Sequence, residues 1–165
     1  DLVIGNEEDA ADVLDIHPVG TDVAVGELNI AGYENVARQI VRQYDNVSRV
    51  AITLRESITA DHNNWGAMLL DVAEDDVCFS PLDATQQYAP FRIGHIVDRV
   101  GGGDSFAAGL LHALHSDKLQ GTQQIIDFAV AASCLKHSIK GDFSYITEAE
   151  VLALAGGNAS GRVQR

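Results

Sequence analysis

The chain is poor in cysteine, which argues against two classes of small protein. Only Cys78 and Cys134 occur among its 165 residues, and neither has a companion at metal-ligand spacing. A disulfide-stabilised secreted domain uses more cysteines, and a structural zinc site uses four ligands. We therefore expect two reduced, buried thiols in a cytoplasmic protein.

Basic residues are also scarce. Lysine and arginine together number 11 against 24 acidic residues, so the formal net charge is −13. This balance disfavours binding to nucleic acid or to an anionic membrane surface. No apolar run approaches the roughly 20 residues that span a bilayer. ATP is not excluded, because local N–H groups and a metal ion can outweigh the average charge.

Hydrophobic residues make up 46% of the chain, which is enough for the core of one domain. The expected helices cover residues 6–15, 30–44, 104–115, 122–138 and 148–154, and the expected strands cover residues 2–4, 47–54, 66–72, 77–80 and 94–97. Residues 16–28 are expected to form a loop. This alternation predicts the α/β class, with a mostly parallel sheet flanked by helices and one antiparallel excursion over residues 66–80.

The stretch from Asp98 to Gly109 carries the clearest functional signal. It reads Asp-Arg-Val-Gly-Gly-Gly-Asp-Ser-Phe-Ala-Ala-Gly, so three glycines precede an apolar helical segment. Consecutive glycines let backbone N–H groups approach a ligand, and the helix adds unpaired donors and its positive dipole end. The pattern predicts a phosphate-binding loop beside Asp104, whose carboxylate could accept a hydroxyl proton during phosphoryl transfer.

A purely structural interpretation of the same stretch is a glycine-rich turn in which Asp104 caps the next helix. Two familiar nucleotide motifs do not fit. A dinucleotide fingerprint requires glycine where Phe106 stands, which disfavours a nicotinamide oxidoreductase. A P-loop requires Gly-Lys-Ser/Thr, whereas Gly103 precedes Asp104-Ser105.

Two further candidate residues follow other predicted strands. Asn6 comes after the strand at residues 2–4, and Arg55 comes at the end of the strand at residues 47–54. Ligands of α/β sheets bind beyond the carboxyl ends of the strands. Asn6, Arg55 and the glycines are therefore expected on one rim. The structural alternatives are that Asn6 caps a helix and that Arg55 pairs with a surface acid.

Residues 98–104 resemble the signature of the PfkB/ribokinase family of carbohydrate kinases, and Arg99 within it is most similar to the 2-keto-3-deoxygluconate kinase branch. Gly5-Asn6-Glu7-Glu8-Asp9 resembles the family element that positions magnesium and phosphate, with Asp9 in place of the usual glutamate. Residues 50–55 resemble the strand beside the nucleotide, with Arg55 in place of the usual glycine.

The resemblance implies a ribokinase-like, Rossmann-type three-layer fold in which residues 1–155 are the nucleotide-binding and catalytic part and residues 156–165 a tail. It implies ATP and Mg²⁺ as cofactors, with K⁺ as a further possibility. The resemblance implies that Asp104 is the catalytic base and that Gly101, Gly102 and Gly103 form the anion hole. It implies that Asn6 and Asp9 assist magnesium and that Thr53, Arg55 and Ser133 lie beside ATP. It also implies that Asp98 and the Val100 carbonyl bind a monovalent cation.

Family members also have an N-terminal half, which carries nearly all sugar contacts and which this sequence lacks. The resemblance therefore implies a C-terminal piece of a kinase for a sugar acid of the 2-keto-3-deoxygluconate type. We expect negligible sugar phosphorylation by residues 1–165 alone, with a missing N-terminal segment or a second copy as partner. The alternative is a noncatalytic nucleotide- or anion-binding module, or a folding half.

Overall fold

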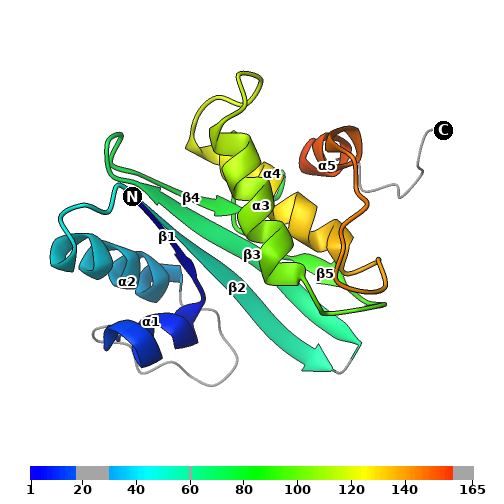
Figure 1. Cartoon of the computed structure of the whole chain (residues 1–165), viewed down its shortest axis with the longest axis horizontal. Helices are drawn as coiled ribbons and strands as arrows, with labels where there is room; N and C mark the ends of the chain where they lie inside the picture. The colour runs from blue at the N-terminus through cyan, green and yellow to red at the C-terminus, as the bar shows by residue number, and fades with distance from the viewer. Residues whose placement is uncertain (18–29, 60, 158–165) are drawn as a thin grey trace.

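The computed structural model describes residues 1–17, 30–59 and 61–157, which form one mixed sheet between two layers of helices (Figure 1). The elements are β1 (Leu2–Gly5), α1 (Glu7–Leu14), α2 (Ile30–Gln43), β2 (Arg49–Thr59), β3 (His62–Asp71), β4 (Asp76–Ser80), β5 (Phe91–Ile93), α3 (Gly102–Leu114), α4 (Thr122–Lys136) and α5 (Glu148–Ala155). Helices α1 and α2 cover one face of the sheet, α3 and α4 cover the other, and α5 packs on α4.

The strand order is β1-β2-β3-β4, and β5 pairs with β3. Among the described strands, β1 and β2 form the single parallel pair, with Gly5 aligned to Ile52. The α/β class with flanking helices is confirmed. The sheet is mixed rather than mostly parallel, because β2, β3 and β4 follow one another through connections too short for a crossover.

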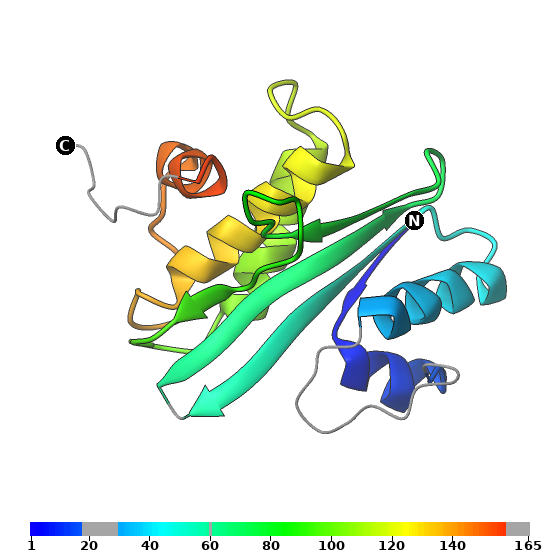
Figure 2. The same cartoon turned by 180° about the vertical axis from the view of Figure 1, so that it is seen from behind.

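Strands β2 and β3 extend further than predicted. The expected strands end at residue 54 and begin again at residue 66, but β2 continues to Thr59 and β3 begins at His62. Asn63 and Asn64 adopt strand geometry because β2 and β5 hydrogen-bond to them from both sides, which overrides the local turn preference of asparagine. This extension carries the β2–β3 hairpin well beyond the amino end of α3 (Figure 2).

The strand expected at residues 94–97 is wrong, since the last strand is Phe91–Ile93. The N–H of Val97 instead donates to the carbonyl oxygen of His137 at 2.9 Å, beyond the end of α4. The loop expected at residues 16–28 falls mostly on residues 18–29, and most of the expected tail falls on residues 158–165. Both of these ranges lie outside the described residues.

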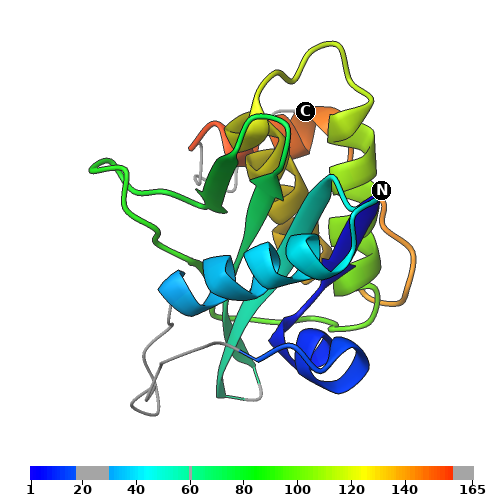
Figure 3. The ribbon, with the colours of Figure 1, turned by 90° about the vertical axis from the view of Figure 1, so that its left-hand side faces the viewer.

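The alternation of side chains along β2 divides the core in two. Val50, Ile52 and Leu54 are buried against α1 and α2. Ala51 faces the opposite way and packs with Phe106 of α3. Because strand residues alternate between faces, Thr53 and Arg55 share the face of Ala51 and α3. Figure 3 shows this arrangement edge-on, with α2 and α3 on opposite sides of the sheet.

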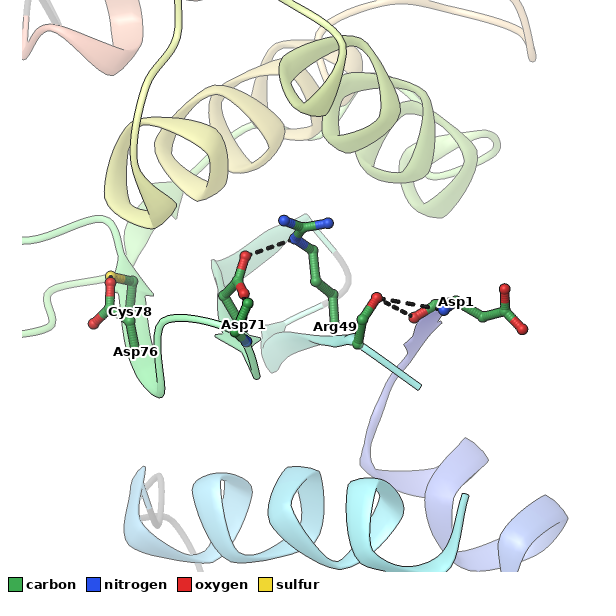
Figure 4. Close-up of polar contacts among 7 residues, drawn as sticks. Asp1, Arg49, Asp71, Asp76 and Cys78 are labelled. Atoms are coloured by element: carbon green, nitrogen blue, oxygen red, sulfur yellow. Dashed lines mark hydrogen bonds and ion pairs between the residues drawn. The ribbon is translucent and has the colours of Figure 1, made fainter. Parts of the chain in front are cut away.

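The amino end of β2 is fixed by polar contacts (Figure 4). Arg49 Nε lies 2.7 Å from Asp71 Oδ2, and the two residues are directly paired across β2 and β3. The N–H groups of Ser48 and Arg49 both donate to the Asp1 carbonyl oxygen, at 2.8 and 3.2 Å. These contacts hold β1, β2 and β3 in register, so their opposite ends form a defined rim.

Both cysteines are free thiols, as expected, but each is partly buried and not fully buried as predicted. Burial raises the pKa of Cys134 to about 12, and burial followed by the Asp76 carboxylate raises the pKa of Cys78 to about 12. The Cys78 thiol donates to Asp76 Oδ2 at 3.4 Å (Figure 4). Thiols with such pKa values are protonated at neutral pH and react slowly. In the described ranges no helix combines the length and apolar character needed to cross a membrane.

Candidate functional site

The carboxyl end of β1 and the amino end of α3 lie at the same end of the sheet (Figures 1 and 3). Asn6 follows β1 directly and caps α1, while the glycines at 101–103 open α3. Thr53 Oγ1 is 3.5 Å from the Gly5 carbonyl oxygen, which places the middle of β2 beside the end of β1. The end of β1 and the start of α3 therefore share this rim as predicted, whereas Arg55 lies within β2, which continues to Thr59, and not beyond the carboxyl end of that strand.

The backbone at the start of α3 leaves N–H donors unpaired. Gly101 is the N-cap, has the left-handed φ of 77°, and provides no side-chain hydrogen bond. The carbonyl of Gly101 accepts from Ser105 N at 2.9 Å. Within residues 1–17, 30–59 and 61–157, the N–H groups of Gly103 and Asp104 make no hydrogen bond. Such donors at a helix N-terminus suit an anion.

Helix α3 begins at Gly102, two residues earlier than predicted. Asp104 consequently lies within the first turn, and the structural alternative in which Asp104 is the N-cap is wrong. The side chain of Asp104 is exposed. A carboxylate in the first turn is compatible with the helix dipole and lies next to the unpaired donors.

The glycine loop rests on the carboxyl end of α4. Ser133 is completely buried, and its hydroxyl donates to the Gly102 carbonyl oxygen at 2.7 Å. The N–H groups of Val97 and Asp98 donate to the carbonyl oxygen of His137 at 2.9 and 3.4 Å. A Cβ added at Gly102 would lie 3.3 Å from the His137 ring. The loop therefore takes its shape from α4 as much as from its own glycines.

The Ser133 hydroxyl was predicted to lie beside ATP. Its hydrogen bond to Gly102 and its burial favour a different role, in which Ser133 positions the glycine loop. Lys136 and His137 were not singled out from the sequence. The signal that could have identified them is the polar spacing 133, 136 and 137 in the otherwise apolar stretch 128–137, because residues three and four apart share one helix face.

His137 is buried and neutral. Desolvation is the main cause that lowers the pKa of His137 below 6.5, and the charges of Lys136, Arg99 and Arg55 lower it further. The ring nitrogen Nδ1 lies 2.8 Å from the Ser133 carbonyl oxygen, which can only accept, so Nδ1 carries the proton. The ring also packs on Trp65 with centroids 5.0 Å apart.

Arg55 is exposed and lies directly opposite Trp65 in the β2–β3 register. Directly opposed residues of an antiparallel pair share one face, so Arg55 belongs to the face covered by α3 and α4. The Arg55 charge is the smallest of the causes that lower the pKa of His137, after burial and the charges of Lys136 and Arg99. Thr53 and Arg55 thus lie between the end of β1 and the His137–Trp65 contact, on the face where the nucleotide was predicted.

Asn6 and Asp9 form a capping box at the start of α1. Asp9 N donates to Asn6 Oδ1, and Asn6 N donates to Asp9 Oδ2, both at 2.9 Å. The structural alternative for Asn6 is therefore correct. Among the described residues, no three His, Cys, Asp or Glu side chains are grouped so that they could hold a metal. Asn6 and Asp9 could assist Mg²⁺ held mainly by phosphate oxygens, which is how Mg²⁺ is usually bound in nucleotide sites.

Asp98 and Val100 were predicted to mark a monovalent cation site. The Asp98 carboxylate accepts from Val100 N at 3.0 Å and Gly141 N at 2.8 Å. These backbone hydrogen bonds are the main cause that lowers the pKa of Asp98 below its ordinary value. The Val100 carbonyl oxygen accepts from Lys136 Nζ at 2.7 Å. The Lys136 ammonium group therefore already binds one of the two predicted K⁺ ligands, the Val100 carbonyl oxygen.

A pocket adjoins the first turn of α3 and lies between α3, α4 and the segment that leads into α5. Its lining includes Ser105, Ala108, His112, Phe128, Ala132 and Ser144. The rings of His112 and Phe128 stack with centroids 5.2 Å apart along one wall. Small side chains beside an aromatic one leave room for a flat ligand.

No protein-family model matches the chain, and no curated protein matches it either. Among solved structures, a 2-dehydro-3-deoxygluconokinase of Thermotoga maritima is 40% identical over 95% of this chain, with a TM-score of 0.77. A PfkB family carbohydrate kinase of Listeria grayi is 25% identical over 94%, with a TM-score of 0.69. A third structure, from Enterococcus faecalis, has a TM-score of 0.72 at 23% identity and shares the fold.

The chain spans 42% of the length of the Thermotoga protein and 41% of the Listeria protein. These solved relatives are carbohydrate kinases, as the resemblance of residues 98–104 implies, and the ribokinase-like fold is confirmed.

Proposed function

We propose that this chain is the ATP-binding and catalytic-base part of a carbohydrate kinase of the PfkB family, to which its solved relatives belong. The proposed reaction transfers the γ-phosphoryl group of ATP to a hydroxyl of a sugar acid of the 2-keto-3-deoxygluconate type. The observation that supports it best is the start of α3, where the unpaired N–H groups of Gly103 and Asp104 adjoin an exposed carboxylate.

In this proposal the Gly103 and Asp104 N–H groups bind oxygens of the transferring phosphoryl group. The attacking sugar oxygen forms a bond to the γ-phosphorus while the bond from phosphorus to the β,γ-bridging oxygen breaks and ADP leaves. The Asp104 carboxylate accepts the proton of the attacking hydroxyl. Preformed donors lower the barrier because they need no rearrangement as charge develops.

Asn6, Asp9 and Arg55 supply the remaining charge around the phosphates. Asn6 and Asp9 would assist Mg²⁺ that is held mainly by phosphate oxygens, and bound Mg²⁺ neutralises charge on those oxygens. Arg55 is exposed on the α3 side of β2, where its guanidinium can donate to phosphate oxygens. The Thr53 hydroxyl contacts the Gly5 carbonyl oxygen and so holds the end of β1 beside β2.

We place the adenine base in the pocket between α3 and α4. The pocket begins at Ser105, the residue that follows Asp104, so one ligand can extend from the pocket to the unpaired N–H groups. Ala108 and Ala132 leave room for a ring, and Phe128 offers an aromatic contact.

Calorimetric titration with ATP and Mg²⁺ tests the nucleotide site. Wild type should bind saturably. Gly103→Ala should weaken binding by roughly tenfold or more, since a methyl at an anion-facing position blocks close approach. Ala108→Trp should weaken it by filling the pocket, whereas Leu111→Trp, at an exposed position of α3 outside the pocket, should not. No saturable binding by wild type would refute the proposed site.

Turnover tests Asp104. In a protein that carries residues 1–165 together with a sugar-binding part, Asp104→Asn should reduce phosphoryl transfer to 2-keto-3-deoxygluconate about 10²–10⁴-fold. ATP affinity should change little, because the backbone donors remain. A coupled ADP-release assay measures the rate, and unchanged turnover would remove Asp104 from the base role.

A nucleotide-binding module without transfer is the second candidate, favoured by the chain's span of only 42% of its Thermotoga relative. It predicts the same titration results. It differs in predicting no Asp104-dependent transfer when a sugar-binding part is present.

A further inference from the structure

A buried ammonium group lies directly behind the glycine loop. Lys136 has no exposed surface, and its Nζ donates to the carbonyl oxygens of Val100 at 2.7 Å, Gly141 at 2.7 Å and Ile139 at 3.3 Å. A protonated amine has three N–H groups, and each is matched here by one carbonyl oxygen. Rings of backbone carbonyl oxygens are also the ligands with which proteins replace the hydration shell of K⁺.

The Asp98 carboxylate completes this arrangement. Val100 and Gly141 each donate an N–H to Asp98 and offer a carbonyl oxygen to Lys136. One negative and one positive side chain therefore bind the same two peptide segments, residues 98–101 and 139–142. The buried Lys136 charge would be costly without partners, and the partly buried Asp98 holds in place the two segments whose carbonyl oxygens supply those partners.

The cluster determines the shape of the glycine loop. A Cβ added at Gly101 would lie 2.7 Å from the Asp142 carbonyl oxygen and 3.3 Å from Lys136 Cε. The loop is thus in contact with both the lysine stem and the segment that the ammonium group holds. Ser133, one helical turn earlier on α4, fixes Gly102.

We propose that Lys136 is a built-in monovalent cation that holds the glycine loop in shape without a free ion. This proposal replaces the expectation that Asp98 and the Val100 carbonyl bind K⁺, because the Val100 carbonyl oxygen accepts from Lys136 Nζ and the Asp98 carboxylate accepts from backbone N–H groups. Lys136 is a positioning residue, since its Nζ donates to backbone carbonyl oxygens on both sides of the loop. The proposal goes beyond the proposed kinase function. It rests on that function only in the test that measures ATP binding.

Thermal unfolding in different salts tests the proposal without any activity. Wild type should have the same midpoint in KCl, NH₄Cl and tetramethylammonium chloride at equal ionic strength. Lys136→Ala should lower the midpoint by roughly 5–10 °C, since three backbone carbonyl oxygens lose a charged partner. KCl and NH₄Cl should restore part of that loss, because the vacated space admits a small cation, and tetramethylammonium should not.

Two further variants separate charge from packing. Lys136→Met keeps the apolar stem and blocks the space, so its midpoint should be low in all three salts. Lys140→Ala removes an exposed lysine and should resemble wild type. If Lys136→Ala does not fold in tetramethylammonium chloride, the folded fraction after refolding becomes the measured quantity. This fraction should be higher in KCl than in tetramethylammonium chloride.

Three results would overturn the proposal: a K⁺-specific rise of the wild-type midpoint, a Lys136→Ala variant as stable as wild type, or a destabilised variant that no small cation restores. Titration of wild type with ATP and Mg²⁺ in KCl and in tetramethylammonium chloride separates the two proposals. Equal affinities agree with both. If ATP does not bind in either salt while the stability pattern holds, the proposed function fails and the built-in cation stands.

Discussion

Two glycines of the same loop should respond in opposite ways to one substitution. Gly101 has a φ of 77°, and a Cβ there would lie 2.7 Å from the Asp142 carbonyl oxygen and 2.9 Å from Asp142 Oδ1. At Gly103 an added Cβ would meet nothing within 4 Å. We predict that Gly101→Ala damages the fold, whereas Gly103→Ala leaves the fold intact and damages only anion binding.

The size of the Gly101→Ala effect follows from two contributions. Left-handed backbone costs an alanine about 1–2 kcal/mol. Relief of the contact with Asp142 requires residues 141–142 to move, which strains the hydrogen bonds of Gly141 with Asp98 and Lys136, worth about 1 kcal/mol each. A total of about 3–4 kcal/mol corresponds to a fall of roughly 10 °C in the unfolding midpoint.

Gly103 lies inside the first turn of α3, where alanine is the better helix former by about 0.5–1 kcal/mol. The Gly103→Ala midpoint should therefore equal or slightly exceed that of wild type, while its ATP affinity falls. Differential scanning calorimetry and ATP titration on all three proteins measure both properties. Equal stability of Gly101→Ala and wild type would refute the geometric reasoning, and unchanged ATP affinity of Gly103→Ala would refute the placement of the phosphate.

Two other predictions concern the helices behind the loop. Gly109→Ala should lower the free energy of unfolding, measured in urea, by about 1–3 kcal/mol, because the new Cβ would lie 2.9 Å from Ala132 Cβ and force α3 away from α4. An unchanged free energy of unfolding would show that the two helices separate freely. Lowering the pH from about 7.5 to about 5.5 should destabilise wild type more than His137→Gln. Burial depresses the pKa of His137 in the folded protein. In this pH range the unfolded chain therefore takes up a proton at His137 that the folded chain does not. Stability from this group is then complete above its ordinary pKa of 6.5 and declines as the pH falls below it, and equal pH dependence of the two proteins would contradict this assignment.

The sequence alone was sufficient where structure depends on neighbouring residues. Thr147 and Glu150 have the sequence spacing of a capping box, and both hydrogen bonds of that box form at the start of α5. The unpaired donors at Gly103 and Asp104 likewise follow from glycines placed directly before a helix. Both features involve groups a few residues apart, so local preference and geometry fix them.

The tertiary structure alone decided where distant segments meet. Asn63 and Asn64, a turn-like pair, became strand because β2 and β5 hydrogen-bond to them. Lys136 is typical of a solvated surface residue in sequence, yet its Nζ meets a carbonyl oxygen 36 residues away. The Ser133 hydroxyl likewise meets a carbonyl oxygen 31 residues away. No local pattern encodes such partners, since only packing of α4 against the glycine loop brings the oxygens to the ammonium group.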